Sequence, residues 1–284
     1  MRNVQRNVQT TFAVSVDLYY ELWGPFLHLA IFEDPSLDLA AAFEATHRRY
    51  LVAIRGDAVQ RILDVGCGGG AFAEWLADHT AAHVLGIDIS DAQLARARKR
   101  VRPHLQFRKH SVMEVGKLAE APFDAAVCLD AATYFPDKRA AVRRVAGVLA
   151  RGARFLLIDW CRPSQTTPLQ EELVLEPLCR YWGYPNMETA SRYEDHFSEA
   201  GFRLLEREDL SERVQRNWEL GYAAANQALA VLSPERVKEL TARILRYGTA
   251  GVRRAKEQYY AAVFSKVAAD AGLLRYTYFL AERR

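Results

Sequence analysis

The stretch Ile62-Leu63-Asp64-Val65-Gly66-Cys67-Gly68-Gly69-Gly70 is the most informative part of this chain. A short apolar run ends in glycines, and the next residues, AFAEWLADH (71–79), have helical periodicity. The pattern predicts a strand, a tight turn and a helix. Glycines at such a turn allow positive φ and a close approach of the backbone to a ligand. We therefore expect a ligand-binding loop here.

Further apolar runs on both sides of this loop alternate at first with helical patterns. Predicted strands span 61–66, 83–89, 104–110, 123–130, 153–160, 202–208 and 273–282. The pairs Ser90/Gln93 and Ser191/Glu194 predict capping boxes that open two helices. Strands and helices at this spacing indicate a parallel sheet with helices on both faces. The predicted fold class is α/β, a Rossmann-like, seven-stranded, mostly parallel sheet.

The segments outside the simple alternation predict a helical cover and two lid insertions. The expected boundaries are an N-terminal helical cover (1–56), an α/β cofactor-binding core (57–160), a lid insertion (161–190), a core continuation (191–209), a helical lid insertion (210–270) and a last core strand (271–284). Insertions that leave and rejoin one sheet usually carry the substrate-specific parts.

Composition excludes some classes of protein. The 284 residues include 38 basic and 35 acidic ones spread along the chain, which argues against a broad nucleic-acid surface. No apolar stretch has the length of a membrane span, and the first residues lack a signal-peptide core. The four cysteines show no C-x-x-C spacing and read as free thiols, and the histidines show no metal spacing. We expect a cytoplasmic enzyme without a metal.

Two acidic residues help to decide which type of cofactor the glycine loop binds. Asp64 precedes the first glycine by two residues, where it would repel a pyrophosphate but suit a cofactor with a cationic ammonium and sulfonium. Asp88 ends the next strand and can accept hydrogen bonds from ribose hydroxyls of either cofactor type. Gly66, Gly68 and Ala71 also fit the dinucleotide pattern G-x-G-x-x-A, which stays the alternative.

With these residues, the chain resembles the class I S-adenosylmethionine-dependent methyltransferases from about residue 17 to its end. It is most similar to the branch of tocopherol, sterol and natural-product methyltransferases. Residues 23–28 (WGPFLH) resemble the W-G-x-x-x-H segment of that branch, which forms a helical cover over the cofactor. Residues 129–137 (LDAATYFPD) resemble its L-E-x-x-x-H-x-P-D segment, and Asp159-Trp160 closes the fifth strand as expected.

The resemblance implies S-adenosylmethionine as cofactor and S-adenosylhomocysteine as product. The cofactor-binding residues expected are Tyr20, Trp23, Asp64, Gly66, Gly68, Gly70, Asp88, Ile89, Gln93, Ser111, Val112, Met113 and Asp130. The chain departs from the branch at two places. Tyr134 replaces a histidine that can lie near the accepting atom, and Ser111 replaces the acid that holds the adenine amine.

Methyl transfer to a hydroxyl or amine also needs a group that removes a proton. Asp130, Tyr134 and Asp159 should converge over the carboxyl ends of the strands. Asp159 is the first choice for a general base or orienting group, with a loop-capping role as the alternative. Tyr134 either hydrogen-bonds the acceptor or forms part of the pocket wall. His28 is either structural or a contact to cofactor or substrate.

Aromatic residues in the insertions indicate the acceptor. Tyr181, Trp182, Tyr184 and Trp218 suggest a flat, apolar molecule such as a polyketide, indole, terpenoid or prenylated ring. The alternative is that they pack the lid onto the sheet. Arg180 and the Arg253-Arg254 pair could bind a diphosphate, although such arginines are usually solvated.

The function predicted is methyl transfer from S-adenosylmethionine to a small, largely apolar acceptor in natural-product biosynthesis. No N/D-P-P-Y/F segment or Pro-Cys nucleophile supports a DNA or RNA methyltransferase. The alternatives are a related enzyme that cyclises or rearranges its substrate without net methylation, and a non-catalytic cofactor-binding module. A homo-oligomer stays an alternative, because the N-terminal helices and the lid could pack between subunits.

Overall fold

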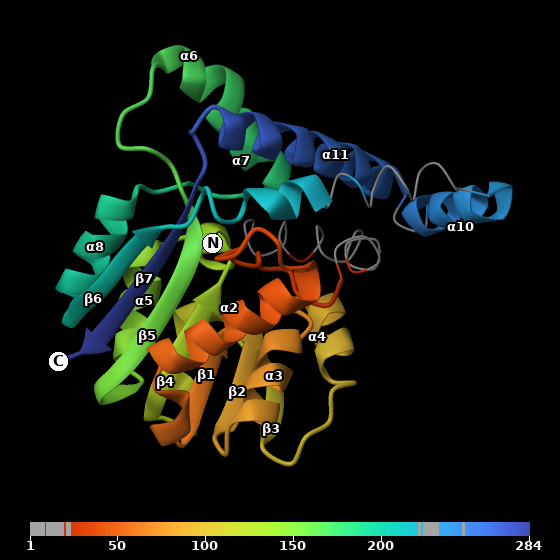
Figure 1. Cartoon of the computed structure of the whole chain (residues 1–284). Coiled ribbons are helices and arrows are strands. Elements are labelled where there is room, and N and C mark those ends of the chain that lie inside the picture. Colours follow the sequence, from red (N-terminus) through yellow and green to blue (C-terminus); the bar gives the residue numbers. More distant parts are fainter. Residues whose placement is uncertain (1–8, 10–19, 21–23, 221–222, 224–232, 246–247) are drawn as a thin grey trace.

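A seven-stranded sheet forms the centre of the molecule in the computed structural model, which describes residues 9, 20, 24–220, 223, 233–245 and 248–284 (Figure 1). The strand order is β3-β2-β1-β4-β5-β7-β6, and only β7 runs antiparallel to its neighbours. The strands are β1 Arg61–Val65, β2 His83–Asp88, β3 Leu105–Lys109, β4 Phe123–Leu129, β5 Leu149–Cys161, β6 Phe202–Asp209 and β7 Arg275–Arg283. The predicted Rossmann-like, mostly parallel sheet is confirmed.

Helices cover both faces of this sheet, and others lie above its upper edge. They are α2 Leu39–Ala53, α3 Ala71–His79, α4 Asp91–Ala97, α5 Lys138–Ala146, α6 Pro168–Gln170, α7 Glu176–Trp182, α8 Ala190–Glu199, α10 Pro234–Leu245 and α11 Gly248–Asp270. The short helices are η1 Gly56–Ala58, η2 Val112–Lys117, η3 Ala132–Tyr134 and η4 Glu171–Leu175, the last with π geometry.

Alternating residues of the central strands build two separate cores. Ile62 of β1 joins the core beneath α2 and α3, whereas its neighbour Leu63 joins the core beneath α5 and α8. The same alternation holds in β4 and β5, because successive side chains of a strand point to opposite faces. Both faces are therefore apolar and covered, as expected for parallel strands.

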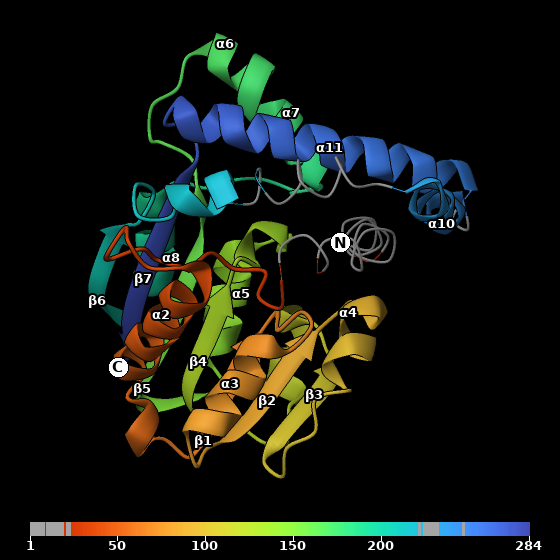
Figure 2. The same cartoon turned by 45° about the vertical axis from the view of Figure 1, so that its right-hand side comes forward.

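Helices of the two predicted insertions lie over the edge where the parallel strands end. Figures 1 and 2 show α6, α7 and α11 above this edge, with α10 extending beyond the sheet. α7 and α11 pack against each other, with Tyr181 against Tyr260 and Phe264 at ring-centroid distances of 5.4 and 5.5 Å. The site at this edge is therefore bounded by the core below and helices above.

The structure corrects one of the two predicted capping boxes and confirms the other only in part. α8 begins at Ala190, because Thr189 rather than Ser191 caps it by accepting from the Arg192 amide. Ser90 does cap α4, accepting from the Gln93 amide, but the Gln93 side chain bonds Tyr20 instead of returning to the cap. From residue 24 on, the predicted N-terminal helical cover (1–56) is helical only in α2 and at the start of η1, because 24–38 form no helix; residues 1–8, 10–19 and 21–23 lie outside the described residues. No helix in the described part of the chain is long and apolar enough to cross a bilayer.

Candidate active site

The glycine loop between β1 and α3 adopts the conformation that its sequence predicts. Gly66, Gly68 and Gly70 have φ of 77°, 52° and 76°, a region that strongly favours glycine. A Cβ on Gly66 would lie 2.4 Å from the Cβ of Ala131, and one on Gly70 would lie 2.5 Å from the ring of Phe107. A Cβ on Gly68 would meet nothing closer than 3.6 Å. The loop is therefore closely packed at Gly66 and Gly70, and it leaves space beside Gly68.

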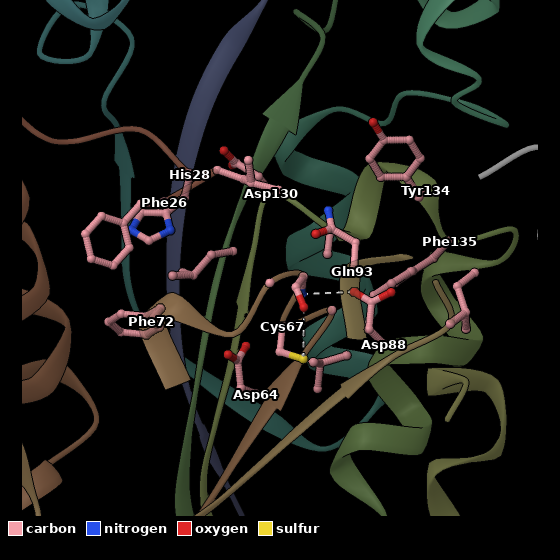
Figure 3. Close-up of a pocket in the computed structure, with 18 of the residues that line it drawn as sticks. Phe26, His28, Asp64, Cys67, Phe72, Asp88, Gln93, Asp130, Tyr134 and Phe135 are labelled. Carbon is pink, nitrogen blue, oxygen red and sulfur yellow. Dashed lines mark hydrogen bonds between the residues drawn. The ribbon is translucent and has the colours of Figure 1, made fainter. Parts of the chain in front are cut away.

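Asp88 connects the end of β2 to this loop. Its Oδ2 accepts from the Gly68 amide at 3.0 Å (Figure 3). Its Oδ1 accepts from the Ser90 amide at 2.8 Å. Burial raises the pKa of Asp88, although these amide bonds act in the opposite direction. Each carboxylate oxygen can accept a further hydrogen bond, so Asp88 can serve two hydroxyls of a ligand.

Asp64 lies within β1, in the floor of the same pocket. Its side chain is only 3% exposed, and burial together with the charge of Asp88 raises its pKa to about 7. Among the described residues that line the pocket are three carboxylates, on Asp64, Asp88 and Asp130, but no Lys or Arg. A cationic ligand would supply the missing positive charge and favour the ionised form of Asp64.

Asp130 follows β4 and lies between the glycine loop and the upper part of the pocket (Figure 3). Its φ of 53° places it in the left-handed region, where a non-glycine residue is strained. It is hydrogen-bonded to Tyr276, but its buried Oδ1 has no hydrogen-bond partner in the described part of the chain. Burial, with the charge of Asp159, raises the pKa of Asp130 well above its usual range. A strained, incompletely bonded carboxyl group in a pocket indicates a functional role.

Several residues of the N-terminal segment line the pocket, among them Tyr20 and His28. The Tyr20 hydroxyl accepts from the Gly69 amide at 2.9 Å and donates to Gln93 Oε1 at 2.8 Å, so it joins the glycine loop to α4. His28 lies at the opposite side, with its Nε2 2.8 Å from Nε2 of His47. Burial lowers the pKa of His28 to about 3, so the ring is neutral near pH 7.

Aromatic rings form the upper wall of the pocket. The wall consists of Tyr134, Trp160, Trp182, Tyr184 and Trp218. The rings of Tyr134 and Tyr184 meet edge to face at 4.9 Å, and Trp182 stacks on Tyr184 at 6.1 Å. Trp182 Nε1 donates to Ser265 Oγ of α11 at 2.9 Å, which fixes its orientation. The wall suits a flat apolar molecule.

Most of the predicted site residues line this one pocket. They are Tyr20, His28, Asp64, Gly66, Gly68, Gly70, Asp88, Ile89, Gln93, Ser111, Val112, Met113, Asp130, Tyr134, Trp182, Tyr184 and Trp218. Trp23 lies outside the described residues. Asp159 and Tyr181 are not among the lining residues: Asp159 is fully buried behind the wall, and Tyr181 packs against α11.

Sequence reasoning missed several lining residues. Trp160 was quoted for the family resemblance, yet its place in the pocket was not expected. Ser265 and Leu178 carry no sequence signal, because their role depends on how α11 and α7 pack over the sheet. Phe26 and Phe72 line the side near His28, and only the segment of Phe26 had a recognisable motif.

Comparisons with known proteins agree with this site. A family model described as a methyltransferase domain matches residues 63–157. A 27-O-demethylrifamycin SV methyltransferase of Amycolatopsis mediterranei is 30% identical over 71% of this chain and 75% of its own length. The O-methyltransferase resE of Aspergillus sclerotiorum is 28% identical over 70% of this chain and 76% of its own.

Sterol and tocopherol methyltransferases are further relatives. The crystal structure of the [4+2]-cyclase SpnF superposes with a TM-score of 0.75 at 20% identity, covering 98% of this chain and 96% of that one. The chain belongs to the class I S-adenosylmethionine-dependent methyltransferases, in the branch that includes tocopherol, sterol and natural-product enzymes. Its cofactor is S-adenosylmethionine, which leaves the reaction as S-adenosylhomocysteine.

The raised pKa of Asp64 predicts that cofactor affinity depends on pH. A cofactor ammonium bound beside this carboxyl group would favour its ionised form, so below the pKa of about 7 binding would expel a proton. S-adenosylhomocysteine affinity should fall by up to about tenfold per pH unit below about pH 7 and level off above it. Calorimetry across this range measures the effect, and Asp64→Asn should flatten the profile. A wild-type profile that is already flat would contradict the assignment.

Proposed function

We propose that this methyltransferase methylates a hydroxyl oxygen of a neutral, largely apolar acceptor in natural-product biosynthesis. One observation carries the proposal: the pocket runs from the glycine loop to an aromatic wall, and its described lining holds no Lys or Arg. An anionic acceptor would meet the carboxyl groups of Asp64, Asp88 and Asp130 there, with no Lys or Arg among the described lining residues to balance them. The names of the rifamycin and resE relatives support oxygen as the accepting atom.

The residues of the lower pocket fit the cofactor. We assign the ribose hydroxyls to Asp88, because both of its oxygens retain acceptor capacity, and the ammonium to the pocket near Asp64. Ile89, Val112 and Met113 offer apolar surface to the adenine ring, and Ser111 lies beside them. The open side of Gly68 leaves room for the ligand. When bound, the cofactor supplies an electrophilic methyl group on a sulfonium.

Asp130 is the proton acceptor in this proposal. Asp130 lines the pocket, its Oδ1 has no hydrogen-bond partner in the described part of the chain, and its raised pKa brings its proton affinity closer to that of a hydroxyl. The bound cofactor would supply the methyl group to the acceptor oxygen, and the hydroxyl proton would pass to the carboxylate of Asp130. His28, with a pKa of about 3, takes up a proton poorly and serves as a neutral hydrogen-bonding group.

Of the two roles left open for Asp159, the contacts of its carboxylate favour the structural one. Its Oδ1 accepts from Thr133 Oγ1 at 3.2 Å and its Oδ2 from the Tyr193 hydroxyl at 2.8 Å. Asp159 is fully buried and is not among the described residues that line the pocket. We therefore assign it to holding the loop after β4, which carries Thr133 and Tyr134, and not to proton transfer. Tyr134 is assigned to the wall of the pocket, where its ring meets Tyr184.

The helical segments 161–190 and 210–270 are assigned as the lid over the acceptor. Trp182 and Tyr184 come from the first of them, and Trp218 and Ser265 from the second. Arg180 and Arg253 do not line the pocket, which argues against a diphosphate group. Four free cysteine thiols support the expected cytoplasmic location, where thiols stay reduced.

A substrate screen tests the proposal. The enzyme is incubated with S-adenosylmethionine and neutral phenols, hydroxylated polyketides or geranyl diphosphate, and the products are weighed by mass spectrometry. The proposal predicts products heavier by one methyl group from neutral hydroxylated acceptors, with matching release of S-adenosylhomocysteine. Preference for geranyl diphosphate would contradict the acceptor class. An isomer formed without S-adenosylhomocysteine would instead support cyclisation, the activity named for SpnF.

A further inference from the structure

Lys138 occupies an energetically unfavourable position behind the acceptor-side wall. It is the first residue of α5, and only 1% of its surface is exposed. Burial disfavours an ammonium group, and so does the partial positive charge at the N-terminal end of a helix. Burial accordingly lowers the pKa of Lys138. The residue is retained in the fold only if its surroundings compensate for these costs.

The Lys138 ammonium is compensated by contacts to two segments that are distant in sequence. Its Nζ donates to the carbonyl oxygens of Thr133 at 3.4 Å and Phe135 at 3.3 Å, in the loop after β4. It also donates to Asn186, at 3.1 Å to the carbonyl oxygen and at 2.5 Å to Oδ1, in the segment after α7. The charge of Asp159 favours the protonated form of Lys138.

The two segments held by Lys138 carry the aromatic wall. Tyr134 lies between the two carbonyl groups of the loop, and Tyr184 lies two residues before Asn186. The rings of Tyr134 and Tyr184 touch edge to face, and Trp182 stacks on Tyr184. One ammonium group is therefore hydrogen-bonded to both segments whose aromatic rings meet at the acceptor end of the pocket.

We propose that Lys138 is a positioning residue that joins the loop of Tyr134 to the lid segment of Tyr184 and thereby sets the shape of the acceptor-side wall. The inference rests on the proposed function for the statement that this wall receives the acceptor. Asp159 belongs to the same unit, because it anchors Thr133 of the loop and supplies the counter-charge for Lys138. The cofactor half of the pocket lies outside this unit.

Hydrogen exchange of the S-adenosylhomocysteine complex tests the connection without any acceptor. Lys138→Met and Asn186→Ala are compared with Lys117→Met, which removes a lysine whose side chain is 72% exposed. Asn186 is exposed, so its variant keeps the test open if Lys138→Met fails to fold. We expect faster exchange at residues 133–136 and 183–187 in both test variants, with S-adenosylhomocysteine affinity within about twofold of wild type. Unchanged exchange in both segments would overturn the proposal.

Binding of 2-naphthol, a flat neutral probe, tests the effect on the wall. Calorimetry on the S-adenosylhomocysteine complex should show about tenfold weaker binding for Lys138→Met and a smaller loss for Asn186→Ala. The double variant should be no weaker than Lys138→Met alone, because residues that act through one contact give non-additive losses. Additive losses, or none, would overturn the role of Lys138. Failure of the wild type to bind 2-naphthol would count against the proposed acceptor class, while the exchange result still decides the connection.

Discussion

Asp130→Asn is expected to lower kcat by about two to four orders of magnitude, the usual contribution of a positioned general base. Asn fits the site well, because it tolerates the left-handed backbone at φ 53° and keeps an oxygen for the hydrogen bond with Tyr276. It has no carboxylate to take the hydroxyl proton. Affinity for S-adenosylhomocysteine should change little. The measurement is methyl transfer to an acceptor from the screen, over a range of pH.

The pH profile separates Asp130 from Asp159. At saturating cofactor, kcat of the wild type should rise with pH as Asp130 ionises, because burial raises the pKa of this group well above its usual range. Asp130→Asn should abolish this rise. Asp159→Asn should lower activity at every pH, but activity should still rise with pH. If Asp159→Asn removed the rise and Asp130→Asn did not, the two roles assigned here would be exchanged.

Gly66→Ala is the second substitution with a large expected effect. The new Cβ would lie 2.4 Å from the Cβ of Ala131, and φ of 77° is strained for alanine. About 3 kcal/mol of strain and displacement corresponds to about 100-fold weaker binding of S-adenosylhomocysteine, with a lower melting temperature. Calorimetry and thermal unfolding measure the two effects.

Gly116→Ala is the matched control for this substitution. A Cβ on Gly116 would meet nothing within 4 Å, and its φ does not lie in the left-handed region. The control should therefore keep cofactor affinity and lose little or no stability. Equal affinity of Gly66→Ala and wild type would show that the loop does not need its glycine conformation to bind the cofactor.

The fold could be predicted from sequence because its signals are local. The run from Arg61 to Val65 is apolar, short and followed by glycines, and it forms β1 within a residue of the expected end. The sequence also places Asp88 at the end of a strand, because the apolar strand pattern stops there. Helix starts were less certain, because Thr189 and Ser191 are both good caps and only the structure shows that Thr189 is used.

The acceptor side was harder to predict because distant segments meet there. Asp130 follows β4 and Asp159 lies near the end of β5. The sequence does not show that Thr133 and Tyr193 occupy the oxygens of Asp159, whereas Oδ1 of Asp130 has no partner among the described residues. Tyr181 and Trp182 are neighbours, yet Trp182 lines the pocket, whereas Tyr181 is not among the described lining residues and packs against Phe264 of α11. Helix rotation, not composition, separates these roles.

The most direct test of the central claim is a calorimetric titration of wild type and Asp88→Ala with S-adenosylmethionine and S-adenosylhomocysteine. The Asp88 carboxylate supports the Gly68 and Ser90 amides and is assigned to the ribose hydroxyls, and one lost hydrogen bond to a charged group costs about 1.5–3 kcal/mol. The account predicts binding of both ligands to wild type and at least about tenfold weaker binding to the variant. No binding by wild type, or equal binding by the two proteins, would contradict it.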